Sequence, residues 1–184
     1  TPFTGSSVTY HENGQLEVEG NFKSGQKEGL WKIYSENGSL DKEGNYKDDI
    51  KEGLWKFYWE NGQLKAEGNF KDEILGSAIK EGLWKSYYES GQLEEEGNYK
   101  DGKQEGLWKS YYEKNGKLFK EINYKDGKKE GLWKLYCDED GQSIIAVGNY
   151  KDGKQEGLWK GYWNDGTQRT VVNFEDGKRK GMEK

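Results

Sequence analysis

The sequence predicts an all-β fold, an extended twisted antiparallel β-meander that repeats one β-hairpin unit about seven times. Two observations predict it. A turn-forming dipeptide separates each repeated block from the next, and the block GLWK recurs every 24 to 29 residues, beginning at Gly29, Gly53, Gly82, Gly106, Gly131 and Gly157. A period of this length is typical of repeat arrays, in which each unit is one small supersecondary structure.

Each unit also contains a second anchor, an asparagine followed by an aromatic residue and then by Lys or Glu, at Asn21, Asn45, Asn69, Asn98, Asn123, Asn149 and Asn173. This anchor adds a unit at the N-terminal end. We therefore expect residues 1–184 to form a single array, with units beginning near residues 5, 29, 53, 82, 106, 131 and 157 and a partial cap at residues 181–184.

Two turns are expected in every unit. The first lies at Asn13-Gly14, Asn37-Gly38, Asn61-Gly62, Ser90-Gly91, Asn115-Gly116, Asp140-Gly141 and Asp165-Gly166. Such dipeptides tolerate two positive φ angles, as a two-residue hairpin requires. The second follows the aromatic anchor, at Ser24-Gly25, Asp101-Gly102, Asp126-Gly127, Asp152-Gly153 and Asp176-Gly177. Two reversals per unit predict antiparallel strands that follow one another in chain order.

The strand register can be predicted by pairing residues outward from the Asn37-Gly38 turn. Tyr34 then faces Asp41, and Trp31 falls opposite Gly44. A glycine across from an indole leaves room for the ring to lie over the neighbouring backbone. We therefore expect each GLWK indole to pack on the glycine of the following strand, except where Ile122 or Val172 replaces that glycine.

The same register gathers aromatic residues on one face of the sheet, because side chains in a strand alternate between faces. These candidate binding residues are Trp31, Trp55, Trp59, Trp84, Tyr88, Trp108, Tyr112, Trp133, Trp159 and Trp163. Two interpretations are open. Rings that neighbours cover would be the core of a thin sheet, whereas exposed rings would form a binding track.

Composition limits both the core and the partners. Only 31% of the residues are hydrophobic and the mean hydropathy is −1.23, so a deep aliphatic core is excluded. Eight tryptophans and thirteen tyrosines instead indicate an ordered, aromatic fold. The net charge is −5, which predicts no nucleic-acid partner. No apolar run is long enough to cross a bilayer, so we expect no membrane insertion.

Catalytic and metal-binding chemistry is not expected. His11 is the only histidine and Cys137 the only cysteine, which excludes a zinc site built on these residue types. Acidic residues recur at Glu28, Glu52, Glu81, Glu105, Glu130 and Glu156, and this regularity indicates a structural role rather than one asymmetric catalytic site. We expect no enzyme, no cofactor and no metal.

The block GLWKSYYESGQLEEEGNYKDGKQEG resembles MORN repeats, in the bacterial variant found in the YwqK-type antitoxin family. The resemblance covers essentially the whole chain. It implies a bacterial source and an array of β-hairpins that serves protein scaffolding or docking. The compartment and the oligomeric state stay open; since the sequence begins at Thr1 without methionine, a removed signal peptide is compatible with it.

Two functional hypotheses follow. The first is a non-catalytic repeat scaffold that binds a protein partner, with an antitoxin-like or surface-interaction role. The alternative is a carbohydrate or cell-wall binding module that uses the aromatic face. One further candidate is a partner loop in the irregular stretch after the third aromatic anchor, with Ile74, Leu75 and Ile79 as its apolar residues.

Overall fold

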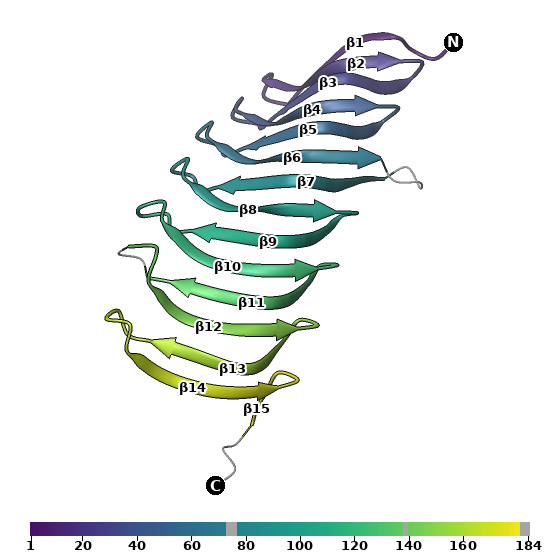
Figure 1. Cartoon of the computed structure of the whole chain (residues 1–184). Helices are drawn as coiled ribbons and strands as arrows, with labels where there is room; N and C mark the ends of the chain where they lie inside the picture. Colours follow the sequence, from purple (N-terminus) through teal and green to yellow (C-terminus); the bar gives the residue numbers. More distant parts are fainter. Residues whose placement is uncertain (73–76, 138–139, 181–184) are drawn as a thin grey trace. The chain divides into compact units, whose positions relative to one another are not determined.

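A computed structural model describes residues 1–72, 77–137 and 140–180. In these residues the chain forms fifteen β-strands joined by turns, and no helix (Figure 1). The predicted all-β meander of hairpins is therefore confirmed. The chain divides into two compact units, Thr1–Gln92 and Leu93–Lys184, which we call unit 1 and unit 2. The predicted cap at residues 181–184 lies outside the described residues.

Unit 1 contains seven of the described strands, and each pairs antiparallel with the next one along the chain. They are β1 (Gly5–Tyr10), β2 (Leu16–Lys23), β3 (Gln26–Tyr34), β4 (Leu40–Lys47), β5 (Ile50–Tyr58), β6 (Leu64–Asp72) and β7 (Ala78–Tyr87).

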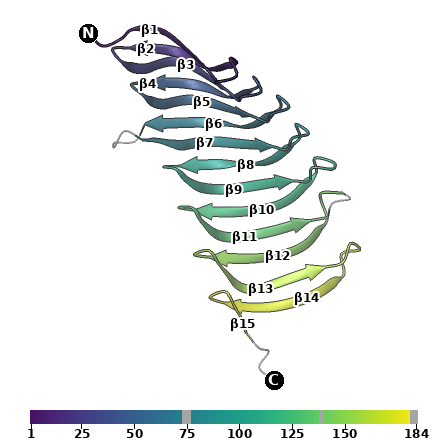
Figure 2. The ribbon, with the colours of Figure 1, turned by 180° about the vertical axis from the view of Figure 1, so that it is seen from behind.

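Unit 2 continues the same pattern with eight described strands, again paired antiparallel in chain order, as the view from behind also shows (Figure 2). They are β8 (Leu93–Lys100), β9 (Lys103–Tyr111), β10 (Leu118–Lys125), β11 (Lys128–Tyr136), β12 (Ile144–Lys151), β13 (Lys154–Tyr162), β14 (Gln168–Glu175) and β15 (Lys178–Lys180).

The first turn of each repeat differs from the predicted two-residue type. At Asn37-Gly38 only the glycine has a positive φ, of 83°. The Gly38 N–H donates to the Ser35 carbonyl at 2.8 Å, and the Ser35 N–H donates to the Ser39 carbonyl at 2.9 Å. This is a type I turn followed by one left-handed residue, which makes a three-residue loop. The prediction of two positive φ angles at this turn is wrong.

The predicted register nevertheless holds for the middle of the strands. Tyr34 lies opposite Leu40, not Asp41, because the pairing shifts by one residue between Ile33 and Tyr34. This shift offsets the extra residue of the loop. Trp31 therefore lies opposite Gly44, as predicted, since a three-residue loop is commonly followed by a one-residue bulge of this kind.

The second turns that lie within the described residues have the two positive φ angles of a type I′ hairpin. Asp101 has a φ of 49° and Gly102 of 74°, and Lys100 pairs with Lys103 directly across the turn. The sequence analysis missed one turn of this type because it contains no glycine. Asp48 and Asp49 have φ angles of 49° and 69°, a conformation that aspartate tolerates better than most side chains.

A bulge in each GLWK strand keeps the indoles on one face. Gly44 of β4 lies opposite Trp55 of β5, whereas the next residue, Asn45, lies opposite Glu52. Gly53 and Leu54 are therefore two extra residues in β5. An even number of extra residues leaves the alternation of faces unchanged. Gly53 has a φ of 67°, the left-handed region that favours glycine.

The core is a row of indoles that lie over glycines. Gly44 is in register with both Trp31 and Trp55, and the ring of Trp55 takes the space: a Cβ on Gly44 would lie 2.3 Å from it. The Trp55 Nε1–H donates to the Asn45 carbonyl at 3.0 Å. The same contact with a glycine of the preceding strand is made by Trp31, Trp55, Trp84, Trp108 and Trp159. The prediction that these indoles pack on the following strand is therefore wrong. Residue pairing could not decide this because it allows both.

Candidate functional site

Four of the predicted binding tryptophans form the core rather than a surface. Trp31, Trp55, Trp84 and Trp108 are 0 to 5% exposed. Their rings contact aromatic residues edge to face, as Trp55 does with Tyr46 at 5.0 Å between ring centroids. Such packing stabilises a sheet that lacks a second layer. These four side chains are therefore not the exposed rings that a binding track requires.

A second set of predicted residues sits at the base of the hairpin loops and ties one repeat to the next. The Trp59 Nε1–H donates to the Tyr87 carbonyl at 2.9 Å, and the Tyr112 hydroxyl donates to the Tyr136 carbonyl at 2.8 Å. His11 occupies the same position in the first repeat, where its Nε2 lies 2.9 Å from the Tyr34 carbonyl. This position has a structural role that the sequence analysis did not foresee.

The remaining predicted residues differ in exposure. Tyr88, Trp133 and Trp159 are half-buried, and Trp159 lies 5.0 Å from Trp133 between ring centroids. Trp163, by contrast, is 53% exposed. Cys137, which stands at the same hairpin position as Trp163, is buried, as expected for a small apolar side chain that replaces an aromatic one.

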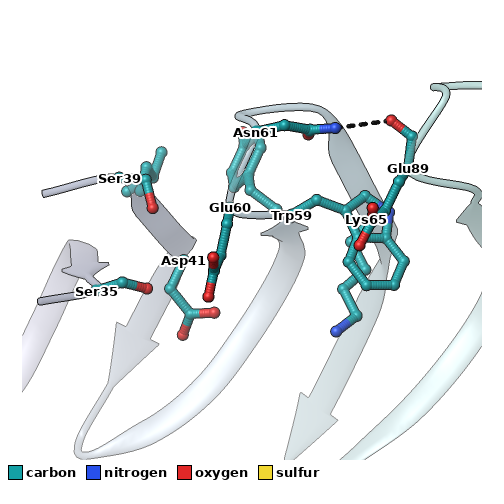
Figure 3. Close-up of a pocket in the computed structure, with 10 residues that line it drawn as sticks. Ser35, Ser39, Asp41, Trp59, Glu60, Asn61, Lys65 and Glu89 are labelled. Carbon is teal, nitrogen blue, oxygen red and sulfur yellow. Dashed lines mark hydrogen bonds between the residues drawn. The ribbon is translucent and has the colours of Figure 1, made fainter. Parts of the chain in front are cut away.

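A groove of about 450 Å³ runs beside the hairpin tips of unit 1 (Figure 3). Trp59 and Lys65 line it, and the Lys65 ammonium lies 4.2 Å from the centroid of the Trp59 ring. The Asn61 side-chain amide donates to the Glu89 carbonyl at 2.8 Å. Trp59 is half-buried and its Nε1–H already has an acceptor, so it presents less free aromatic surface than an exposed indole would.

The exposed indole of unit 2 lines a larger and more open hollow of about 760 Å³. Arg169 lies over the Trp163 ring, with its guanidinium carbon 4.4 Å from the ring centroid. Asn164 and Asp165 line the same hollow, and hydrogen bonds from Thr167 lower the pKa of Asp165. An indole beside amide, carboxylate and guanidinium groups can bind a ligand that has both an apolar face and hydroxyls.

Four of the six repeated carboxylates cap turns. Glu105 Oε2 accepts the backbone N–H of Asp126 at 3.0 Å, and Glu130 Oε2 accepts that of Asp152 at 2.9 Å. Glu28 and Glu156 accept the corresponding N–H groups of Asp48 and Asp176. Among the described residues, no three His, Cys, Asp or Glu side chains are grouped so as to hold a metal ion.

Tyrosine–glutamate pairs link successive repeats on the face opposite the indoles. The Tyr58 hydroxyl donates to Glu43 at 2.7 Å, and Tyr136 donates to Glu121 at 2.6 Å. Burial, followed by the hydrogen bond to the carboxylate, raises the pKa of both tyrosines to about 12. Each hydroxyl therefore stays protonated and acts as a donor, which is a structural role and not that of a general base.

The candidate partner loop is only partly covered by the structure. Ile74 and Leu75 lie outside the described residues. Ile79 belongs to β7, opposite Lys71 of β6, and is half-buried. It is a strand residue in the regular pairing of the sheet.

One surface feature was missed by the sequence analysis. The leucine of every GLWK block points away from the indole face and is 41 to 54% exposed. We call these side chains the leucine row: Leu30, Leu54 and Leu83 in unit 1, and Leu107, Leu132 and Leu158 in unit 2. The signal was present in the sequence, because alternation in a strand must place the leucine opposite the neighbouring buried tryptophan.

The family follows from this repeated geometry and from a sequence comparison. The profile of the MORN repeat variant matches residues 3–24, 27–48, 51–72, 80–101 and 104–126, more than half of the chain. The chain belongs to the MORN repeat variant family. Beyond these five MORN segments, β11 to β14 repeat the same register, with Trp133 opposite Gly148 and Trp159 opposite Val172.

Other comparisons add little to the MORN assignment. No curated protein matches the chain. Among solved structures, the crystal structure of a protein with unknown function from Bacteroides fragilis is 10% identical; the match covers 96% of this chain and 95% of that one, with a TM-score of 0.12. At that score the match carries no argument. No helix among the described residues is long and apolar enough to span a membrane.

Proposed function

We propose that this MORN repeat array is a non-catalytic scaffold that binds a protein partner. The leucine row carries the proposal. Leu30, Leu54 and Leu83 are about half exposed, at 49, 47 and 48%, and the same position is exposed in every later repeat. Isolated exposed leucines are ordinary, but a row of them at one register of a highly polar chain is typical of an interaction surface.

The energy available from this surface suits docking. Fully burying a leucine is worth about 1.5 to 3 kcal/mol, so covering the exposed half of three leucines would contribute roughly 2 to 4 kcal/mol. Lysine and glutamate side chains flank the row, as in the facing pair Lys56 and Glu67. A polar rim around an apolar centre is the usual anatomy of a protein interface.

The regular roles of the ionisable groups support the non-catalytic part of the proposal. Carboxylates that could act as acids or bases cap turns or accept tyrosine hydroxyls, and they do so in the same way in several repeats. An enzyme needs groups whose environments differ from one another. We therefore propose no reaction for this chain.

The test is capture of partners from a lysate of the source organism. The bait with Leu30→Ser, Leu54→Ser and Leu83→Ser should lose the specifically retained protein, whereas a bait with Val171→Ser, which changes an exposed valine outside the row, should retain it. Circular dichroism must show the same fold for all baits. Equal retention by all three baits, or no specific protein on any of them, would reject the proposal.

The likeness to YwqK-type antitoxin repeats makes a toxin the first partner class to test. We propose that the captured protein inhibits growth when it is expressed alone, and that co-expression of the array restores growth. The leucine-row variant should fail to restore it. Normal growth with the captured protein alone would remove the antitoxin role but would leave the scaffold proposal in place.

A second candidate function, carbohydrate binding, is favoured by one observation, the exposed indole of Trp163 in its hollow. Soluble cell-wall glycan fragments should quench tryptophan fluorescence of the wild type and not of Trp163→Ser. Trp59→Ser is the matched control, because the Trp59 indole is half-buried and its Nε1–H is already hydrogen-bonded. Equal quenching of the two variants would exclude the Trp163 hollow as a glycan site.

A further inference from the structure

The indole face of unit 1 carries a row of lysines that the function proposed above does not use. Lys27, Lys51 and Lys80 occupy the same position in β3, β5 and β7, four residues before Trp31 and Trp55 and before Trp84. Each faces the aromatic residue of the preceding strand, namely Phe22, Tyr46 and Phe70. We call these three side chains the lysine row.

The ammonium groups of the row are held over aromatic rings. Lys51 Nζ lies 4.4 Å from the centroid of the Trp55 ring and 5.1 Å from that of Phe70. Lys27 Nζ lies 4.8 Å from Trp31, and Lys80 Nζ lies 4.2 Å from Trp84. These cation–π contacts fix the position of each charge but do not neutralise it.

The carboxylates near Lys27 and Lys51 have other partners. Asp41 lies 3.0 Å from the ammonium of Lys42, and Asp49 Oδ1 accepts the backbone N–H of Lys27. In the described part of the chain, neither Lys27 nor Lys51 has an ion pair with a carboxylate. Burial, followed by the charge of Lys42, lowers the pKa of Lys51, although the charge of Asp41 acts in the opposite direction. Burial and the like charges thus outweigh the nearest carboxylate.

Unit 2 lacks an unbroken row of this kind. In its described strands, the equivalent positions opposite the aromatic anchors alternate between glutamine and a cation: Gln104, Lys129, Gln155 and Arg179. Glu95 of β8, on the same face, raises the pKa of Tyr99 by its charge, after the larger effect of burial. The unbroken row of cations is therefore a property of unit 1, although the whole chain has a net charge of −5.

We propose that the lysine row of unit 1 binds an acidic, proline-rich protein segment in the polyproline II conformation, with a carboxylate at every third residue. Successive lysines of the row lie two strands apart, which is about 9.6 Å. A polyproline II helix has three residues per turn and advances about 9.3 Å per turn. It therefore presents every third side chain on one side, at the spacing of the row.

The half-buried aromatic residues that face the lysines, Phe22, Tyr46 and Phe70, fit the same occupant. Proline-rich segments dock on faces lined by aromatic side chains, because their rings are rigid and lose little entropy on binding. A β-strand would turn alternate members of an every-third pattern away from the surface, so it fits less well. This inference rests on the proposed function, since it names the chemistry of one partner for the scaffold.

Titration of the full chain with a synthetic peptide of four Glu-Pro-Pro units tests the proposal by calorimetry or fluorescence anisotropy. Binding should weaken at least tenfold when Lys27 and Lys51 are both changed to Gln. The matched control changes Lys56 and Lys85 to Gln, which removes the same charge from the opposite face of unit 1, and should alter the affinity less than twofold. Binding should also weaken as salt concentration rises.

Two control peptides separate this mode from general electrostatics. A Gln-Pro-Pro peptide of the same length should bind at least tenfold more weakly, and a Glu-Pro peptide, with carboxylates at every second residue, should also bind more weakly. Equal binding of the Glu-Pro peptide would overturn the spacing argument. Tighter binding of vesicles that contain anionic lipid, or of single-stranded DNA, would overturn the acidic-segment proposal.

The leucine-row experiment keeps the two proposals distinguishable. If no acidic peptide binds but the leucine-row variant still loses its captured protein, the lysine-row inference fails and the scaffold function stands. If the acidic peptide binds as expected and no partner depends on the leucine row, the leucine row is not the docking surface and only the lysine row supports binding. If no acidic peptide binds and no captured protein depends on the leucine row, both proposals are rejected.

Discussion

Unit 1 and unit 2 are built from the same repeat but differ at the residue on which the GLWK indole packs. In unit 1 this residue is always glycine, and each indole lies over it: Trp31 on Gly20, Trp55 on Gly44, and Trp84 on Gly68. In unit 2 the residue that pairs with Trp133 on the preceding strand is Ile122, which is only 2% exposed. The repeat can therefore fold with a glycine under the indole or with a buried isoleucine in the place of that glycine.

The consequence appears in the neighbouring indole. Trp133 is half-buried, and in the described residues it makes no hydrogen bond to the carbonyl of Asn123 of the kind that Trp108 and Trp159 make at their asparagines. It packs instead at 5.0 Å from Trp159, with a tilt of 31° between the rings. At this pair of strands the buried side chain is therefore that of Ile122, and the indole of Trp133 is only half-buried.

The largest expected effect comes from emptying the aliphatic site of unit 2. Ile122→Ala removes most of a buried side chain where Trp133 does not fill the space. Loss of apolar burial together with the cavity should cost about 3 kcal/mol in the free energy of unfolding. Urea denaturation followed by circular dichroism measures it. A cost below about 1 kcal/mol would mean that Ile122 is not the core of that repeat.

Enlarging a glycine under an indole of unit 1 should also destabilise the protein, because the added side chain has no room. Gly44→Ala places a Cβ 2.3 Å from the Trp55 ring, so the indole must move and its hydrogen bond to Asn45 weakens. Overpacking of this kind should cost about 2 kcal/mol. Ala66→Ser on β6 is the control in the same unit. If Gly44→Ala unfolds at the same urea concentration as the wild type, the indole is not packed on this glycine.

Much of this architecture could be predicted from the sequence. The GLWK and Asn-Gly spacing predicted the hairpins, the pairing of Trp31 with Gly44, and the face on which the indoles lie. The pairing was right although the turn type was wrong, because the additional loop residue and the bulge at the next strand offset each other. Strand pairing can be predicted from every repeat of the sequence, so an error in the type of one turn did not change the predicted pairing of the strands.

Features that depend on geometry within the pairing could not be predicted. Pairing alone puts Gly44 beside both Trp31 and Trp55, and only side-chain packing decides which ring covers it. The candidate site was predicted in part for the same reason. Aromatic residues were rightly placed on one face, but whether a given ring is buried, as Trp55 is, or exposed, as Trp163 is, depends on the strand that covers it.

A smaller effect should separate the tryptophans at the hairpin tips of the two units. Trp59→Phe removes the hydrogen bond to the Tyr87 carbonyl and weakens the contact with Lys65. We expect a loss of about 1 kcal/mol. Trp163→Phe, at the same position in unit 2, should cost under about 0.5 kcal/mol, since this side chain is mostly exposed. Equal losses in urea denaturation would show that exposure does not distinguish the two positions.

The smallest expected effect is a loss of stability at alkaline pH, and it should be the same in the two units. Burial and a glutamate raise the pKa of Tyr58 in unit 1 and of Tyr136 in unit 2 from 10.0 to about 12. The protonated hydroxyl is thus favoured in the folded state, while the unfolded chain ionises near pH 10. The stabilisation is fully present below pH 10 and is lost as the pH rises from about 10 to about 12.

Replacing the partner carboxylates tests this alkaline dependence. Glu43→Gln and Glu121→Gln leave an oxygen acceptor for Tyr58 and Tyr136 but remove the negative charge that opposes ionisation. Each variant should therefore show a smaller fall in Tm between pH 9 and pH 11.5 than the wild type, by about 1 to 2 °C. Equal changes in both variants would show that the two tyrosine–glutamate pairs are equivalent. Both pairs lie on the face opposite the indoles. A fall as steep as in the wild type would mean that the charge of the glutamates does not set these pKa values.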